Sequence, residues 1–113
     1  MENDKIEFIK RIFQEENEAV TLHNISKIND TEILFAYAQN YNWDDGFKIP
    51  EQILKNKQCD FSTALLIFYG ADGFQMLSEK ESFLNSDLID WKNFLLNLYE
   101  NLIRPVQVSE QLY

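Results

Sequence analysis

The chain has 113 residues, 19 acidic and 10 basic side chains, a formal charge of −9 and one cysteine. The length is typical of one domain, and a hydrophobic fraction of 45% is ample for a packed core, which excludes a disordered chain. The single cysteine excludes an intramolecular disulfide and a zinc site built on several thiolates. The excess of negative charge argues against nucleic acid and anionic membranes as partners and favours a basic protein.

Apolar side chains at helical spacing predict a first helix over residues 3–20, with Ile6, Ile9 and Phe13 on one side. The polar stretch 14–18 is either a solvated face of this helix or its end. We expect residues 23–27 to form a connector.

A second helix is predicted over residues 32–41, with Asp30 or Thr31 as its cap. Residues 42–46 then interrupt the pattern, because Asp-Gly favours a turn in which glycine supplies a positive φ. Pro50 suits the first turn of a short third helix over 51–57.

Residues 63–77 predict a central, mostly buried helix, because their beginning is apolar on all sides. Asp60 or Ser62 is its expected cap. A buried strand is the rival interpretation of the apolar run, but the length of the segment favours a helix. Gly70 and Gly73 indicate either close contact with another helix or a break near residues 71–73.

The last helix is predicted over residues 87–103, with Ser86 or Asp87 as its cap and Pro105 beyond its end. Residues 106–113 form either a short extended tail or a disordered one. The elements together predict an all-α protein: a single compact helical domain, residues 1–113, of four to five packed helices.

Side chains that commonly carry chemistry are scarce. His23 and Cys59 have no spacing that links them, and no serine lies in a nucleophile elbow. The run 40–46 superficially resembles a calcium loop, but its ligand positions fall on Tyr41 and Trp43. We expect no catalytic residue, no metal and no cofactor, and therefore no enzyme.

The carboxylates Asp44 and Asp45 lie side by side in the predicted turn. An acid–base pair is one interpretation. The structural interpretation is better, because adjacent turn residues usually point apart and stay solvated: one Asp folds the turn, and Trp43 and Phe47 anchor it in the core.

A second acidic group lies on the first helix and includes Glu15, Glu16 and Glu18. Such charge runs are commonly solvated faces, and in a complex they raise the association rate and specificity. The aromatic side chains Tyr41, Trp43 and Tyr69 are either interface anchors or core residues. The partner-binding candidates are Trp43, Asp44, Asp45, Glu15, Glu16 and Glu18.

The middle of the chain resembles a bacterial family known as the domain of unknown function 4274 family. The resemblance rests on Asn-Tyr-Asn-Trp-Asp-Asp-Gly-Phe at 40–47, Ile-Pro at 49–50, Cys-Asp at 59–60, Thr-Ala-Leu-Leu at 63–66 and Ala-Asp-Gly at 71–73. It covers residues 36–77. Small acidic bacterial proteins of this kind resemble immunity proteins, which neutralise toxin domains.

No apolar run approaches the roughly 18 residues of a membrane span, and the N-terminus has no signal-peptide core. The expected localisation is therefore cytoplasmic. The sequence predicts an immunity protein that occludes a basic toxin domain by steric and electrostatic means. The alternative is a non-catalytic intracellular interaction or scaffold domain without a toxin partner.

Overall fold

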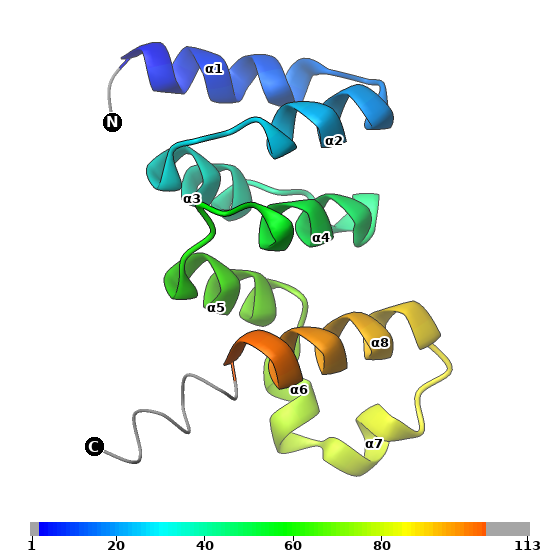
Figure 1. Cartoon of the computed structure of the whole chain (residues 1–113). Coiled ribbons are helices and arrows are strands. Elements are labelled where there is room, and N and C mark those ends of the chain that lie inside the picture. The colour runs from blue at the N-terminus through cyan, green and yellow to red at the C-terminus, as the bar shows by residue number, and fades with distance from the viewer. Residues whose placement is uncertain (1–2, 104–113) are drawn as a thin grey trace, which may run out of the picture. The chain divides into compact units, whose positions relative to one another are not determined.

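The computed structural model describes residues 3–103, all of whose regular structure is helical (Figure 1). The prediction of an all-α protein is confirmed. The expected number of four to five helices is wrong, because several predicted helices are divided by turns and two further helices are present. The predicted tail, residues 106–113, lies outside the described residues. The elements are α1 (Asn3–Gln14), α2 (Glu18–Ser26), α3 (Thr31–Gln39), the 3₁₀-helix η1 (Trp43–Asp45), α4 (Lys48–Lys55), α5 (Phe61–Gly70), α6 (Gly73–Ser78), α7 (Lys80–Leu84), α8 (Ile89–Leu98) and the π-helix η2 (Tyr99–Ile103).

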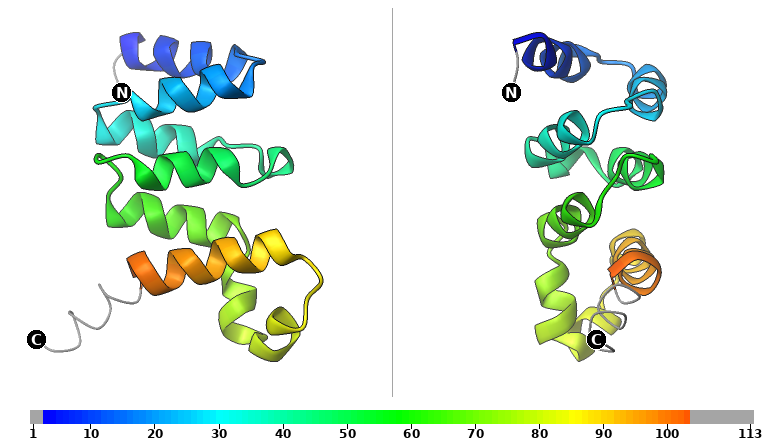
Figure 2. Two further views of the ribbon diagram at one scale, coloured as in Figure 1. Left: turned by 45° about the vertical axis from the view of Figure 1, so that its right-hand side comes forward. Right: turned by 60° about the vertical axis from the view of Figure 1, so that its left-hand side comes forward.

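The chain divides after Asp60 into two compact units. In the N-terminal unit, α1 packs on α3 and α2 packs on α4, which gives two layers of two helices (Figure 2, right). Large apolar side chains are buried within this unit: Ile12, Ile25, Leu34, Tyr37 and Ile53.

The first predicted helix ends at Gln14, so the polar stretch 14–18 is a helix end and not a solvated face. Asn17 begins α2: its side-chain oxygen accepts a hydrogen bond from the backbone N–H of Val20 at 3.1 Å. The predicted connector at 23–27 is wrong, because residues up to Ser26 belong to α2. Thr21 and Ile25, one turn apart, bury the inner face of this helix.

The two following helices lie close to their predicted positions. Asp30 caps α3 by accepting hydrogen bonds from the N–H groups of Glu32 and Ile33, at 2.8 and 3.2 Å. The helix predicted over 51–57 begins earlier, at Lys48. Pro50 lies in its first turn, where a backbone N–H has no partner within the helix.

In the C-terminal unit, α5 packs against α6, α8 and η2 (Figure 2, left). The rings of Phe83 and Trp91 meet edge to face, 4.9 Å apart, and the Trp91 Nε1–H donates to the Ala71 carbonyl at 2.7 Å. These contacts join α7 and the junction of α5 and α6 to α8. Further buried side chains are Ile67, Phe68, Phe94, Leu95 and Leu98.

The helix predicted over 63–77 is broken, as the glycines indicated. Asp72 adopts a left-handed conformation with φ 62° and ψ 36°, and α6 begins at Gly73. The segment predicted over 87–103 forms α8 and η2, but neither Ser86 nor Asp87 is its cap residue. Leu88 occupies that position, and the Ser86 hydroxyl oxygen accepts from its backbone N–H at 3.1 Å. The sequence did not predict α7, which is one turn long and buries only Phe83.

Candidate protein-binding surface

The turn between α3 and α4 carries three of the predicted partner-binding residues, Trp43, Asp44 and Asp45. Its backbone reverses through η1 and Gly46, whose φ of 91° confirms the positive value expected for this glycine. The expectation that an Asp side chain folds the turn is wrong. The Asn42 side chain does so, because its oxygen accepts from the Asp44 N–H at 3.1 Å. Asp44 and Asp45 are consequently exposed to solvent.

Aromatic side chains fix this turn to the N-terminal unit. Tyr41 is buried, and its hydroxyl donates to the Gly46 carbonyl at 2.7 Å. The Trp43 ring meets Tyr41 edge to face at 5.3 Å and Phe47 at 6.3 Å. Trp43 is half-buried, so it supports the turn and still presents part of its ring to solvent. Of the other predicted anchors, Tyr69 is 54% exposed on α5.

The predicted acidic residues come from two separate segments of the N-terminal unit. All of them are exposed, and the α1–α2 connection and η1 lie at the same end of this unit (Figures 1 and 2). The electrostatics supports this placement: burial, and then the charges of Asp45, Tyr37 and Glu18, raise the pKa of the Tyr41 hydroxyl far above its ordinary value. We call this surface the acidic edge; it consists of Glu15, Glu16, Glu18, Asp44 and Asp45.

One cation approaches the acidic edge. Lys48 Nζ lies 3.6 Å from Glu18 Oε1, and both side chains are well exposed. Exposed ion pairs of this kind contribute little to stability, and solvent screens them strongly. The Glu15 carboxylate accepts from the Asn17 N–H at 3.0 Å, which orders the approach to α2. The acidic edge therefore remains strongly negative.

Two of the residues considered for catalysis, His23 and Cys59, interact with residues outside the acidic edge. His23 is exposed on α2, where its backbone carbonyl accepts from the Ser26 hydroxyl at 2.6 Å. Cys59 is half-buried, and burial followed by the nearby Asp60 charge raises the pKa of its thiol to about 11. Among residues 3–103, no three His, Cys, Asp or Glu side chains gather as metal ligands.

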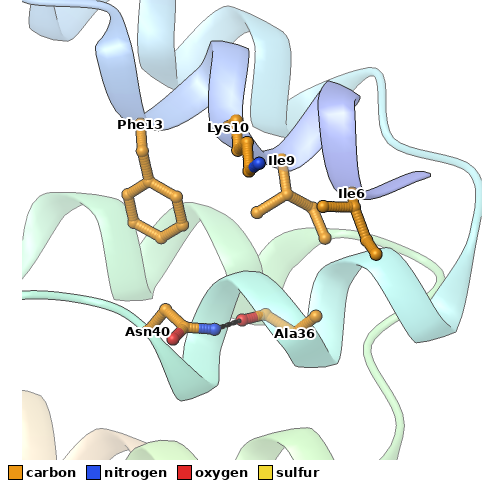
Figure 3. A pocket seen from close by; sticks show the side chains of 6 residues that line it. All are labelled: Ile6, Ile9, Lys10, Phe13, Ala36 and Asn40. Carbon is orange, nitrogen blue, oxygen red and sulfur yellow. Dashed lines mark hydrogen bonds between the residues drawn. The ribbon is translucent and has the colours of Figure 1, made fainter. Parts of the chain in front are cut away.

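A groove between α1 and α3 was not identified from the sequence. It encloses about 440 Å³ and is lined by Ile6, Ile9, Lys10, Phe13, Ala36 and Asn40 (Figure 3). The Phe13 ring stacks on Tyr37 at 4.3 Å. The Asn40 amide donates to the Ala36 carbonyl at 2.8 Å (Figure 3). The helical spacing of Ile6, Ile9 and Phe13 was the only sequence signal for this groove. The same spacing is equally typical of a helix face that packs fully against a core. The groove suits an apolar group and gathers no set of polar groups for chemistry.

The helices and the acidic edge define an all-α protein with a strongly negative exposed surface. The chain belongs to the domain of unknown function 4274 family, which it matches over residues 29–103. This match includes the stretch 36–77 that carries the resemblance and extends it to the end of η2. Neither the curated proteins nor the solved structures gave a significant match. None of the described helices has the length and apolar character needed to cross a membrane.

Proposed function

We propose that the chain is an immunity protein, which binds a toxin domain and neutralises it by steric and electrostatic occlusion. The observation that carries the proposal is the acidic edge, because two segments separated in sequence present exposed carboxylates at one end of the N-terminal unit.

The charge pattern favours a cationic protein as the partner. Clustered exposed carboxylates attract a basic surface over distances of about a Debye length, roughly 8–10 Å in physiological salt. Such complementarity chiefly accelerates association and selects the partner. The exposed part of the Trp43 ring supplies an apolar contact beside the carboxylates.

Occlusion requires no bond-making by this chain. A toxin domain that acts on an anionic substrate, such as a nuclease, holds that substrate with Lys and Arg side chains. The carboxylates of the acidic edge would pair with those side chains, and the helices behind them would block access. Inhibition would then follow from binding alone.

The test is co-expression with the product of an adjacent toxin gene, combined with measurement of complex formation. The variant Glu15→Gln, Glu16→Gln, Asp44→Asn removes three charges from the acidic edge and retains an oxygen at Glu15 for the Asn17 N–H. We expect about tenfold slower association at low salt and loss of growth protection. The matched control, Asp4→Asn, Glu7→Gln, Glu51→Gln, removes three exposed charges elsewhere in the same unit.

Growth inhibition that the unaltered chain does not relieve would contradict the proposal. Equal loss of binding in both triple variants would contradict the role of the acidic edge, because only net charge would then matter. A basic partner that is bound without any effect on growth would favour the alternative, an interaction or scaffold domain.

A further inference from the structure

Among the described residues, the C-terminal unit exposes more large apolar side chains than the N-terminal unit. Single exposed apolar side chains are ordinary on any protein surface, so their grouping is the informative property. This unit supplies seven of the ten large apolar side chains that are exposed in the described chain: Tyr69, Phe74, Leu77, Leu84, Leu88, Ile89 and Leu102.

Three of these side chains lie within six positions of the chain, where α7 ends and α8 begins. Leu84, Leu88 and Ile89 are 48%, 65% and 55% exposed. The turn is held by its own hydrogen bonds, since Lys92 Nζ donates to the Leu84 carbonyl at 3.0 Å and the Lys92 N–H donates to the Leu88 carbonyl at 3.0 Å. The hydrogen bond from Lys92 Nζ therefore links the end of α7, where Leu84 lies, to the start of α8, which follows Leu88.

The inner side of this turn is already filled. Phe83 is fully buried and packs against Trp91, whose indole N–H is bonded to the Ala71 carbonyl. Leu84, which follows Phe83, and Leu88, three residues before Trp91, are exposed to solvent.

Carboxylates lie close to these three apolar residues along the chain. Glu81 lies on α7, and Asp87 and Asp90 flank the pair Leu88–Ile89; all three acidic side chains are exposed. Glu79 adds a fourth negative charge nearby in the chain. The positive charges in the same stretch are those of Lys80 and Lys92. We call the surface of Leu84, Leu88, Ile89, Glu81, Asp87 and Asp90 the α7–α8 corner.

We propose that the α7–α8 corner docks a basic amphipathic segment of a partner protein. The apolar face of that segment would cover Leu84, Leu88 and Ile89, and its Lys or Arg side chains would pair with the carboxylates. A second copy of this chain is a poorer occupant, because the same carboxylates would face each other across the interface. The inference does not depend on a toxin partner, since it concerns a different unit from the acidic edge.

The experiment uses the whole chain and a synthetic helical peptide with leucines on one face and lysines on the other. Calorimetric titration should detect binding that weakens as salt is raised. Leu88→Ser should weaken it about tenfold, the scale of one lost apolar anchor. Asp87→Asn with Asp90→Asn should weaken it at low salt and flatten its salt dependence.

Two variants act as matched controls. Phe74→Ser removes a side chain that is also 65% exposed in the same unit, on α6, and should leave binding unchanged. The triple variant of the acidic edge should also bind the peptide normally, so this test is separate from that of the proposed function. The proposal is overturned if Leu88→Ser binds as well as the unaltered chain, if Phe74→Ser weakens binding equally, or if the chain forms a dimer that Leu88→Ser abolishes.

Discussion

The Phe68 ring occupies the space in which a side chain at Gly73 would lie. A β-carbon placed on Gly73 meets Cε1 of this ring at 2.5 Å, closer than carbon atoms approach without a clash. The ring is 1% exposed and has Tyr99 as a neighbour at 6.1 Å. The glycine of the Ala-Asp-Gly run is therefore required by packing, because it lets α6 begin against α5.

Gly73→Ala should destabilise the protein by about 1–3 kcal/mol, the usual cost of overpacking a core. Urea denaturation would measure the change as a lower midpoint with an unaltered slope. The double variant Gly73→Ala, Phe68→Leu should lose less stability than the sum of the two single variants, because the smaller side chain makes room. Additive losses would refute the steric explanation.

Gly46 is required for a different reason, its backbone conformation. No atom lies within 4 Å of a β-carbon placed there, but φ 91° with ψ −159° belongs to a region that essentially only glycine adopts. Gly46→Ala and Gly46→Asn should each cost about 1–3 kcal/mol in the free energy of unfolding. Asp72→Asn should be tolerated, because position 72 lies in the left-handed helical region that Asn accepts. Equal tolerance of Asn at both positions would contradict this account.

How far the sequence determines the fold can be seen from α3 and α2. The cap and the apolar stripe of α3 are local signals, and together they were sufficient to predict this helix. The inner face of α2 contains the polar residue Thr21, and its end is closed by Asn56, whose amide donates to the carbonyls of Ile25 and Ile28 at 2.9 Å each. No local pattern reveals contacts made by a residue so distant in the chain.

The same distinction applies to the candidate site. The sequence identified Glu18 and Asp45 separately, as members of two acidic groups. Their common influence on Tyr41 depends on the packing of α2 beside α4, which is a tertiary property. Sequence reasoning therefore found the residues of the acidic edge without finding that they lie at one end of the unit.

Lys5 joins α1 to the cap of α3, because its Nζ lies 2.8 Å from Asp30 Oδ2. α1 lies before the family match, which begins at residue 29, so this ion pair ties the preceding segment to the matched region. The hydrogen bond from Lys5 and those from the Ile33 and Glu32 N–H groups lower the pKa of Asp30. Asp30→Ala should lower the urea midpoint at neutral pH more than Lys5→Met does, because it removes both the cap oxygen and the ion pair. A double-mutant cycle should show coupling at neutral pH that fades in acid as the carboxylate becomes protonated, whereas pH-independent coupling would contradict an ionic contact.

Two buried tyrosines should make the free energy of unfolding sensitive to alkali. Burial, followed by the charge of Asp45, raises the pKa of Tyr37 from 10.0 to about 12, and Tyr41 is shifted in the same direction. Because folding raises these pKa values, the stabilisation from the neutral hydroxyls is complete below about pH 10 and is lost as the pH rises toward 12. Denaturation at a series of alkaline pH values should show a falling free energy of unfolding, and Tyr37→Phe should make that fall shallower.

Asp45→Asn should move the titration of Tyr37, followed by ultraviolet absorbance, to lower pH. An unchanged titration in that variant would show that Asp45 does not act on the Tyr37 hydroxyl.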